Sequence, residues 1–423
     1  MSRLPLLVIL GATGTGKSRL GIELAQRFSG EIISADSMQV YRGLDIITAK
    51  VTEEERAMAP HHMLDVVDPL KNYSVIDFRN SALAVINDLL SRTKLPVVVG
   101  GTNYYIESLL WEILVQDPSG YEVGDLVCGN GNAKRLKLVD ESLSNQELLE
   151  KLEEVDPEMA GRLHPNNRRK VIRSLEVFEQ HGRRHSEILK EQRQAGGCGL
   201  GGPLRFRDSI LLWLRCEQEV LDDRLDRRVD SMVKAGLLKE LLDFHERYNR
   251  ERMESNAAPD YTKGIFQSIG FKEFHDYLVL PEDERNGEKG KRLLQQGIED
   301  LKIVTRRYAR KQKKWVTNRL IRRQDRQVPP VYTLDCTDVD QWNGKVLEPA
   351  IAIVSARLRN ETPSQSPVNE NVKNVKANDS SNEEKHTCEI CERTFIGELQ
   401  WNAHLGGAKH KKMVQKKKEL ENS

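Results

Sequence analysis

The sequence contains no apolar run of the ~20 residues that a membrane-spanning helix requires. It has almost no net charge, because 65 Lys and Arg stand against 64 Asp and Glu, which leaves +1. Cysteine is also scarce: there are six, and Cys128, Cys198, Cys216 and Cys336 show no pairing rhythm. These absences exclude membrane-spanning helices and argue against a disulfide framework, so we expect a reducing compartment. A strand-like run already starts at Leu4, so we expect no signal peptide.

Short β-branched runs alternate with helical patterns along most of the chain. Such alternation predicts an α/β fold, a doubly wound parallel sheet whose ligands lie at the carboxyl ends of the strands. The expected strands are Leu4–Leu10, Glu31–Ala35, Leu95–Val99, Ser209–Arg215 and Val331–Leu334. Helical patterns cover Leu20–Phe28, Tyr104–Leu114 and Gln218–Phe244.

Composition changes along the 423 residues indicate several domains. We expect a core in two parts, residues 1–115 and 206–358, interrupted by a mainly helical insertion at 116–205. Residues 359–386 are rich in Asn, Ser, Glu, Pro and Lys, which predicts a disordered linker. A compact module at 387–415 follows it.

Residues 11–18 carry the pattern Gly-x4-Gly-Lys-Ser, directly after an apolar strand and before a helix. In a P-loop of this kind, backbone N–H groups and the helix N-terminus surround phosphate oxygens. The lysine adds a cation, and the serine hydroxyl is placed to bind Mg²⁺. The sequence therefore predicts a site for a diphosphate or triphosphate, made by Gly11, Ala12, Thr13, Gly14, Thr15, Gly16, Lys17 and Ser18.

Two further strand ends carry candidate residues for the same site. Asp36 follows the second strand, where a carboxylate could hold Mg²⁺ through water, abstract a proton, or cap a helix. From the residues alone, the chemical and capping roles of Asp36 are about equally favoured. Thr102 follows Gly100 and Gly101, which allow a close backbone approach, although an ordinary capped turn also fits this motif.

The segment Lys302–Arg326 contains eleven Lys or Arg and a single acid, Asp325. Lys302, Arg306, Arg310 and Lys314 recur every four residues, so they share one face of a helix. A solvated charged face is the simpler explanation, but such faces usually mix both signs. A face of one sign favours a polyanion such as RNA. A second basic cluster, Arg168–Arg173, lies in the predicted insertion.

Near the C-terminus, Cys388, Cys391, His404 and His410 have the spacing Cys-x2-Cys-x12-His-x5-His. Two thiolates and two imidazoles at this spacing bind Zn²⁺ tetrahedrally in a structural finger with no open catalytic position. Phe395 and Trp401 are placed as its apolar plugs, and lysines follow it. A single finger beside a lysine-rich tail is more typical of RNA binding than of DNA reading.

Taken in order, the motifs resemble the tRNA dimethylallyltransferase family, also called tRNA isopentenyltransferases, in its eukaryotic form with a C-terminal zinc finger. The resemblance covers about residues 4–320 and the finger. Its most specific part is Asp-Ser-x-Gln-Val-Tyr-Arg-Gly at residues 36–43. The matching segments are Gly11–Ser18, Asp36–Asp45, Gly100–Tyr105, His164–Val177 and Gln267–Glu273.

The resemblance implies transfer of a dimethylallyl group from dimethylallyl diphosphate to N6 of the adenosine 3′-adjacent to the anticodon of tRNA, with release of diphosphate. It implies that Asp36 takes the N6 proton, that Thr102 holds the amine in line, and that Arg228 joins the P-loop and Mg²⁺ on the leaving group. The base must leave its stack to react. The residues expected to hold the anticodon stem-loop are Ser37, Met38, Gln39, Arg169, Lys170, Arg173, Gln267 and Lys272, together with Arg306, Arg310 and Lys314 of the basic helix.

Two segments match no motif of the family, Tyr121–Lys137 and the Gly-rich Ala195–Pro203. A P-loop nucleotide or small-molecule kinase is the alternative function, although it explains neither the basic helix nor the finger. A non-catalytic RNA-binding protein with a relic P-loop is a third, against which Lys17, Ser18 and Asp36 argue. We expect a monomer in the cytoplasm, with the nucleus and mitochondria left open.

Overall fold

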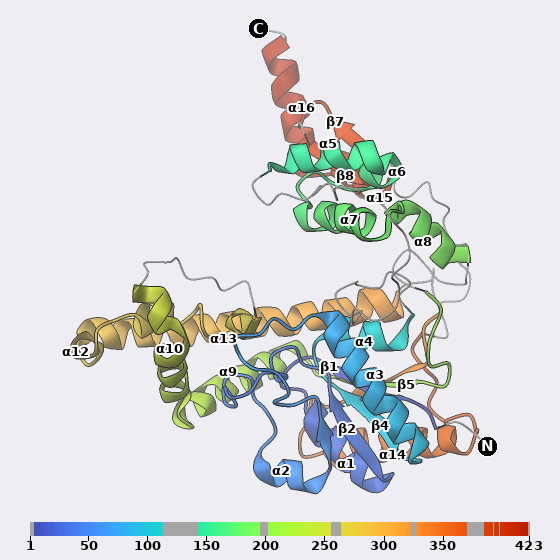
Figure 1. Cartoon of the computed structure of the whole chain (residues 1–423), viewed down its shortest axis with the longest axis vertical. Coiled ribbons are helices and arrows are strands. Elements are labelled where there is room, and N and C mark those ends of the chain that lie inside the picture. The colour runs from blue at the N-terminus through green and yellow to red at the C-terminus, as the bar shows by residue number, and fades with distance from the viewer. Residues whose placement is uncertain are drawn as a thin grey trace, which may run out of the picture. The chain divides into compact units, whose positions relative to one another are not determined.

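The structure, a computed structural model, describes residues 4–112, 143–194, 202–254, 264–322, 327–369, 385–391, 393–396 and 398–421. The chain divides into two compact units (Figure 1). The first contains residues 1–112, 204–323 and 327–373, and the second contains residues 113–203, 324–326 and 374–423. The unmatched segment Tyr121–Lys137, and residues 195–201 of the Gly-rich one, lie outside the described residues. Among the described helices, none has the length and apolarity to cross a membrane.

A six-stranded sheet forms the centre of the first unit, in the order β3-β2-β4-β1-β5-β6. All its strand pairs are parallel. The five strands that the sequence predicts are present, within a few residues of the expected bounds. The additional β3 is only two residues long and pairs with β2, too short a run for a strand pattern. The bounds are β1 Leu7–Gly11, β2 Gly30–Ser34, β3 His61–His62, β4 Leu95–Val99, β5 Ile210–Arg215 and β6 Val331–Asp335.

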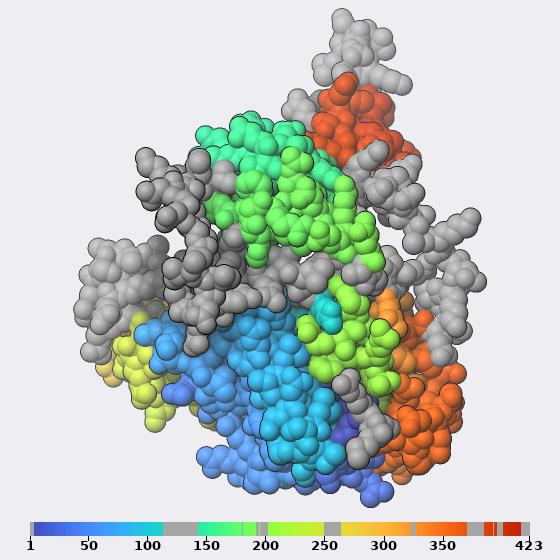
Figure 2. Space-filling model, turned by 45° about the vertical axis from the view of Figure 1, so that its right-hand side comes forward, coloured from blue at the N-terminus to red at the C-terminus, as the bar shows by residue number. Residues whose placement is uncertain are grey.

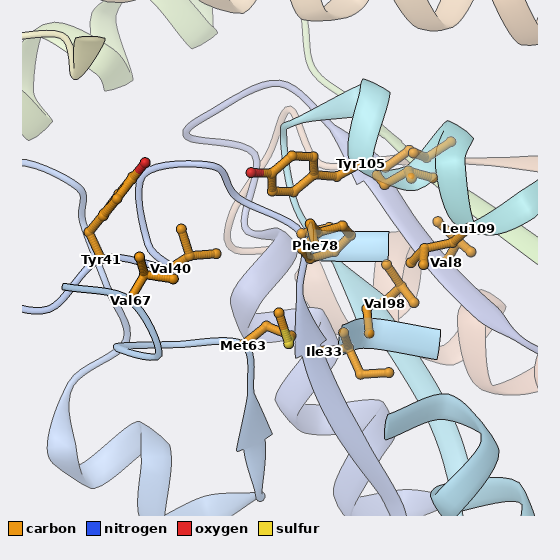
Figure 3. Close-up of a cluster of buried hydrophobic side chains, with 14 of the residues drawn as sticks. Val8, Ile33, Val40, Tyr41, Met63, Val67, Phe78, Val98, Tyr105 and Leu109 are labelled. Atoms are coloured by element: carbon orange, nitrogen blue, oxygen red, sulfur yellow. The ribbon is translucent and has the colours of Figure 1, made fainter. Parts of the chain in front are cut away.

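Alternate side chains of each strand enter two different cores. Val8 and Leu10 of β1 point toward the cluster that includes residues of α3, α4 and α13, whereas Leu7 and Ile9 point toward α1 and α14. Figure 3 shows part of the first cluster, in which Phe78 stacks on Tyr105 with ring centroids 4.0 Å apart. Because both faces are covered, the strands read as continuous apolar runs, as a buried parallel sheet requires.

Ten α-helices lie within the described residues of the first unit. The helix expected over Gln218–Phe244 is in fact two, because Gly236 between them has φ +104. Figure 2 shows that the surface of this unit is built from distant parts of the sequence, with blue and cyan residues beside yellow-green and orange ones. The bounds are α1 Lys17–Arg27, α2 Glu53–Met58, α3 Val75–Ser91, α4 Asn103–Leu110, α9 Gln218–Lys234, α10 Leu237–Glu254, α11 His275–Leu278, α12 Glu282–Arg285, α13 Glu288–Val316 and α14 Glu348–Leu358.

The prediction of a disordered linker over 359–386 is wrong for its first residues. Residues 365–369 are hydrogen-bonded to the edge strand β6. The N–H of Val368 donates to the carbonyl of Val331 at 2.8 Å, and the N–H of Val331 donates to Asn369 Oδ1 at 3.0 Å. Gln365 Nε2 donates to the carbonyl of Thr333 at 2.8 Å. Polar side chains here occupy an open sheet edge, which composition alone does not reveal. Residues 370–384 lie outside the described part of the chain.

Among its described residues, the second unit has the four helices α5 to α8 and a small zinc-finger-like module. In the helical part, buried Asp156 accepts the N–H groups of Met159 and Ser186 and so joins two helices. In the module, two antiparallel strands precede two helices. The bounds are α5 Asn145–Val155, α6 Pro157–Arg162, α7 Arg168–His181, α8 His185–Gln194, β7 Lys385–Cys388, β8 Arg393–Ile396, α15 Glu398–Leu405 and α16 Ala408–Glu421.

Candidate active site at the carboxyl ends of the strands

The P-loop connects β1 to α1 in a conformation that needs its glycines. Gly14 and Gly16 have φ +80 and +84, in the left-handed region that favours glycine. A Cβ on Gly16 would also lie 2.8 Å from the ring of Trp342. The loop closes on itself, because Thr15 Oγ1 and Lys17 Nζ both donate to the carbonyl of Ala12 at 2.8 Å. Helix α1 begins at Lys17, so its free N–H groups face the loop.

Lys17 and Asp36 are partly buried groups of opposite charge that interact electrostatically beside this loop. Burial lowers the pKa of Lys17 to about 8, although the nearby Asp36 carboxylate opposes the shift. Burial likewise raises the pKa of Asp36, opposed by the N–H of Met38 and the cations of Lys17 and Arg228. Desolvation disfavours both charged forms, while their mutual attraction favours them. The carboxylate is therefore more basic than an exposed one.

Thr102 fixes the loop that carries Asp36. Its Oγ1 accepts the N–H of Ser37 at 2.9 Å and donates to Ser37 Oγ at 3.2 Å. Thr102 stands at the N-cap of α4 but makes no side-chain capping bond, so the ordinary capped turn is not what forms here. Asp36 caps no helix either: its Oδ1 accepts the N–H of Met38 at 3.0 Å in a turn. A Cβ on Gly100 would lie 2.1 Å from the carbonyl of Ala35, which explains the glycine.

Two residues of α13 that the sequence argument missed complete this arrangement. Gln312 is buried; its Oε1 accepts the N–H of Thr13 at 2.8 Å, and its Nε2 donates to the carbonyl of Gly101 at 3.1 Å. The phenol of Tyr308 is within hydrogen-bonding reach of the side chains of Gln312 and Thr102, and burial raises its pKa. A Tyr and a Gln four residues apart inside a lysine-rich helix were the available signal.

Helix α9 brings two arginines to the other side of the P-loop. Burial lowers the pKa of Arg228, and the Asp36 carboxylate opposes this shift. Arg224, also missed from the sequence, donates to the carbonyl of Gly14 at 3.3 Å and to the carbonyls of Cys336 and Thr337 at 3.2 and 3.1 Å. Arg224 is thus engaged in holding the loop, whereas Arg228 faces the Asp36 carboxylate.

Two adjoining cavities meet at Asp36. The first has a volume of about 900 Å³ and includes Gly14, Lys17 and Ser18 of the P-loop. The second has a volume of about 520 Å³ and includes Tyr308 and Gln267. Six residues line both cavities, so the two cavities are neighbours at this point: Thr13, Asp36, Thr48, Ala49, Arg228 and Met232.

The residues predicted to hold RNA lie in different places. Ser37, Met38 and Gln267 line the second cavity. Gln39 lines the first, but its side chain is bonded to its own loop, accepting from Ser34 Oγ at 2.9 Å and donating to the carbonyls of Thr48 and Ala49. Lys272 is exposed and lines neither cavity. Arg169, Lys170 and Arg173 lie on α7 of the second unit, where the first two are exposed and Arg173 pairs with Glu176.

Three of the four residues of the predicted basic stripe on α13 are ion-paired with helix α9. Lys302 pairs with Asp230 at 2.8 Å, Arg306 pairs with Asp226, and Arg310 pairs with Asp222. The three acids recur every four residues on α9, so the two helices are joined by a ladder of ion pairs. The charge pattern of α13 alone does not reveal these partners, because Arg306 and Asp226 are 80 positions apart in the chain. The fourth stripe residue, Lys314, is exposed, and Arg307 and Lys311 of the same helix line the second cavity.

The four predicted zinc ligands lie together in the finger. Ligand atoms of Cys388, Cys391, His404 and His410 are all within 4.8 Å of one another. Nε2 of His404 is buried and has no hydrogen-bond partner within the described part of the chain, which fits a metal ligand. Phe395 stacks on His404 with ring centroids 4.1 Å apart, and Trp401 lies against Phe395, as expected for the plugs of a small finger. Two thiolates and two imidazoles suit Zn²⁺.

Comparisons with known proteins agree with this geometry. The family model described as IPP transferase matches residues 39–319, one for isopentenyl transferase matches residues 4–65, and one for a zinc finger of C2H2 type matches residues 386–410. The chain is 51% identical to a tRNA dimethylallyltransferase of Mus musculus, over 99% of this chain and 87% of that protein. It is 35% identical to one of Schizosaccharomyces pombe, over 98% of this chain and 96% of that protein.

Solved structures show the same fold. Crystallographic snapshots of a eukaryotic dimethylallyltransferase acting on tRNA align with a TM-score of 0.80 and 32% identity, over 99% of this chain and 98% of that one. A tRNA isopentenylpyrophosphate transferase of Bacillus halodurans aligns with a TM-score of 0.51 and 31% identity, over 84% of this chain and 98% of that one. The kinase alternative is not favoured. The chain belongs to the tRNA dimethylallyltransferase, or IPP transferase, family.

Proposed function

We propose that this protein transfers the dimethylallyl group of dimethylallyl diphosphate to N6 of the adenosine 3′-adjacent to the anticodon of tRNA, releasing diphosphate. The observation that carries the proposal is that Asp36 and Arg228 line both cavities. One cavity includes the P-loop and suits a diphosphate; the other includes Tyr308 and Arg307 and suits a base with its phosphates. Reacting groups that enter from the two sides would meet beside the Asp36 carboxylate.

The P-loop side would stabilise the leaving group. As the bond between C1 of the dimethylallyl group and the bridging oxygen breaks, the electron pair leaves with the diphosphate. N–H groups of residues 14–18, the ammonium of Lys17 and the guanidinium of Arg228 are preorganised for this charge. Mg²⁺, when bound, would neutralise part of the same charge. The Ser18 hydroxyl lines this cavity and is the hard oxygen donor that Mg²⁺ prefers.

The Asp36 side would activate the amine. The N6 lone pair forms the new bond to C1, and the N6 proton passes to the Asp36 carboxylate. The raised pKa of Asp36 brings its basicity closer to what proton abstraction needs. Thr102, bonded to the backbone of the next residue, would hold the amine and the carboxylate in line.

We assign the tRNA anticodon stem-loop to the second cavity and the surfaces around it. Ser37, Met38 and Gln267 would contact the splayed nucleotides, with Arg307 and Lys311 neutralising phosphates. Arg169, Lys170, Arg173, Lys272 and Lys314 stay as proposed contacts outside the cavity. We also propose that the protein is a monomer. Light scattering of the purified protein tests that state, and microscopy of a tagged copy tests the cytoplasmic location.

The experiment incubates the purified full chain with unmodified tRNA, labelled dimethylallyl diphosphate and Mg²⁺. We expect label in tRNA and, by mass spectrometry of the nucleosides, one dimethylallyl group on the adenosine next to the anticodon. Wild-type protein that leaves tRNA unlabelled but hydrolyses or transfers phosphate from ATP would overturn the proposal in favour of a kinase.

A further inference from the structure

Tyr104 is an exposed aromatic ring close to the proposed RNA site. It is 60% exposed, and no other aromatic residue occurs among the exposed large apolar side chains of the described residues. The adjacent Tyr105 is buried against Phe78, so the Tyr-Tyr pair at the start of α4 sends one ring to the core and one to solvent. Leaving a large ring in water forfeits the gain from burying it, which points to a ring that a ligand covers.

Trp315 packs against this ring, and Arg319 in turn lies beside Trp315. The rings of Tyr104 and Trp315 meet edge to face, with centroids 6.0 Å apart and planes at 73°. The guanidinium of Arg319 lies 5.9 Å from the centroid of Trp315, and it pairs with Glu107 at 3.7 Å. Because Tyr104 is 60% exposed in this packing, its ring keeps open surface for a further stacking partner.

Residues of α4 and of α13 both place the Tyr104 ring near the second cavity. On α13, Tyr308 and Lys311 line that cavity, and Trp315 follows Lys311 by one turn, about 10 Å along the axis from Tyr308. On α4, Tyr104 follows by two residues the Thr102 that bonds Ser37 beside Asp36. The Tyr104 ring therefore lies beside the second cavity, next to the place proposed for the reacting base.

We propose that Tyr104 stacks on the base of a nucleotide adjoining the modified adenosine, which rests on the proposed function. Single-stranded nucleotides are recognised by bases stacked on aromatic rings and by cations on their phosphates. The exposed Lys311 and Lys314, which precede Trp315 on α13, supply the cations. Flipping the target base unstacks its neighbour, and the Tyr104 ring replaces the lost partner. Tyr104 is thus a specificity-determining residue that favours a large base at that neighbouring position.

The experiment measures the Kd of the full chain for an RNA hairpin with the anticodon-loop sequence, and for hairpins with an abasic nucleotide on either side of the target. We expect Tyr104→Ala to bind the intact hairpin about 5- to 150-fold more weakly, the range for loss of one stacked base. Tyr104→Phe should bind like wild type, because the ring is kept. Met58→Ala, another 51% exposed apolar side chain, is the control and should bind like wild type.

The losses of affinity caused by Tyr104→Ala and by the abasic nucleotide should not add. An abasic nucleotide at the stacking position should weaken wild type by a similar factor and leave Tyr104→Ala unaffected, as in a coupled double-mutant cycle. Additive losses at both neighbouring positions, or wild-type affinity of Tyr104→Ala, overturn the stacking role. A loss that is the same for every hairpin indicates a fold defect and also overturns the stacking role. Wild-type protein that does not bind the hairpin overturns the proposed function itself.

Discussion

Gln312 accepts the backbone N–H of Thr13 at 2.8 Å, so helix α13 is hydrogen-bonded directly to the P-loop. The same side chain donates to the carbonyl of Gly101 at 3.1 Å, in the loop that carries Thr102. One buried amide therefore sets the spacing between the proposed diphosphate cradle and the group proposed to align the amine. The spacing between those two loops decides whether the reacting atoms meet, and displacement by about 1 Å can cost 10²-fold in rate.

Gln312→Ala should lower the single-turnover rate of transfer by about 10- to 100-fold, because the P-loop and the Gly101 loop lose their common partner. The affinity for tRNA should change little, since Gln312 is buried and lines neither cavity. Gln341→Ala, which removes an exposed Gln bonded to Asp338, is the matched control. Equal loss of tRNA affinity in Gln312→Ala would instead indicate general unfolding, which circular dichroism would detect.

The sheet and the P-loop were predictable because their determinants are local. Continuous apolar runs indicate strands buried on both faces, and residues 11–18 must form a phosphate loop in that context. Gln312, Tyr308 and Arg224 were not predictable, because their role depends on which helix lies over which loop. The residues Gln312 and Thr13 are 299 positions apart, and no periodicity of either segment encodes their contact.

The affinity for diphosphate should depend on the charge of Lys17. Its pKa is lowered to about 8, so the free protein loses this cation as the pH rises through about 8. Inorganic diphosphate should therefore bind more weakly at pH 9 than at pH 7, by about tenfold per unit above the pKa. Calorimetric titration of wild type and Lys17→Ala separates this effect from ionisation of the ligand, which both share. Parallel pH profiles of the two proteins would contradict the prediction.

The same shift has a consequence for stability with a definite sign. On unfolding, the pKa of Lys17 returns to the ordinary lysine value of 10.5, so between about pH 8 and 10.5 the unfolded chain binds the extra proton. The charged form is disfavoured in the fold; its contribution therefore destabilises below about pH 8 and is relieved as the pH rises. The difference in unfolding free energy between wild type and Lys17→Met should grow in favour of wild type across this window.

Asp36→Asn should slow transfer by about 10² to 10⁴, the usual weight of a general base. The amide keeps the shape and can still accept the N–H of Met38, but it cannot take the N6 proton. Asp68→Asn is the matched control, because Asp68 Oδ1 accepts the N–H of Leu70 in the same way outside both cavities. Single-turnover rates within about a factor of three of wild type would reduce Asp36 to a turn-forming residue.

Two sets of three cations on α13 should behave differently. Neutralising Arg307, Lys311 and Lys314 should flatten the salt dependence of tRNA binding, by roughly 0.7 in log–log slope for each lost single-strand phosphate contact. Neutralising Lys302, Arg306 and Arg310 should mainly lower Tm, because these residues pair with acids of α9. Partly exposed pairs contribute about 0.2–1 kcal/mol each, so the decrease is modest.

The outcome also decides the role of Arg306 and Arg310, which the sequence assigned to tRNA. A large decrease in salt slope for the second set, with little change in Tm, would restore that assignment. The sequence could not decide this point, because Asp222, Asp226 and Asp230 lie about eighty residues earlier, and only the packing of α9 on α13 pairs them. A helix face with charge of one sign predicts an oppositely charged partner, but it does not tell whether that partner is RNA or another helix of the same chain.

Cys388→Ser should remove the zinc and unfold the finger, while the transfer rate at saturating tRNA stays close to wild type. A structural zinc supplies most of the folding energy of so small a module, whose apolar interior here is Phe395, Trp401 and the ligands. The P-loop, Asp36 and the residues that line both cavities belong to the other compact unit, so their arrangement does not depend on the fold of the finger. Because lysines follow the finger, we expect it to increase the affinity for tRNA.

The mutant should therefore show a raised KM for tRNA with kcat nearly unchanged, the pattern of lost uniform binding. Metal analysis should find one zinc in wild type and none in Cys388→Ser. Cys216→Ser, which removes a buried thiol of the other unit, is the control and should keep its zinc. Wild-type protein without zinc would contradict the zinc finger itself. A zinc-free mutant with wild-type KM would contradict its role in tRNA binding, since loss of its fold would then leave that binding unchanged.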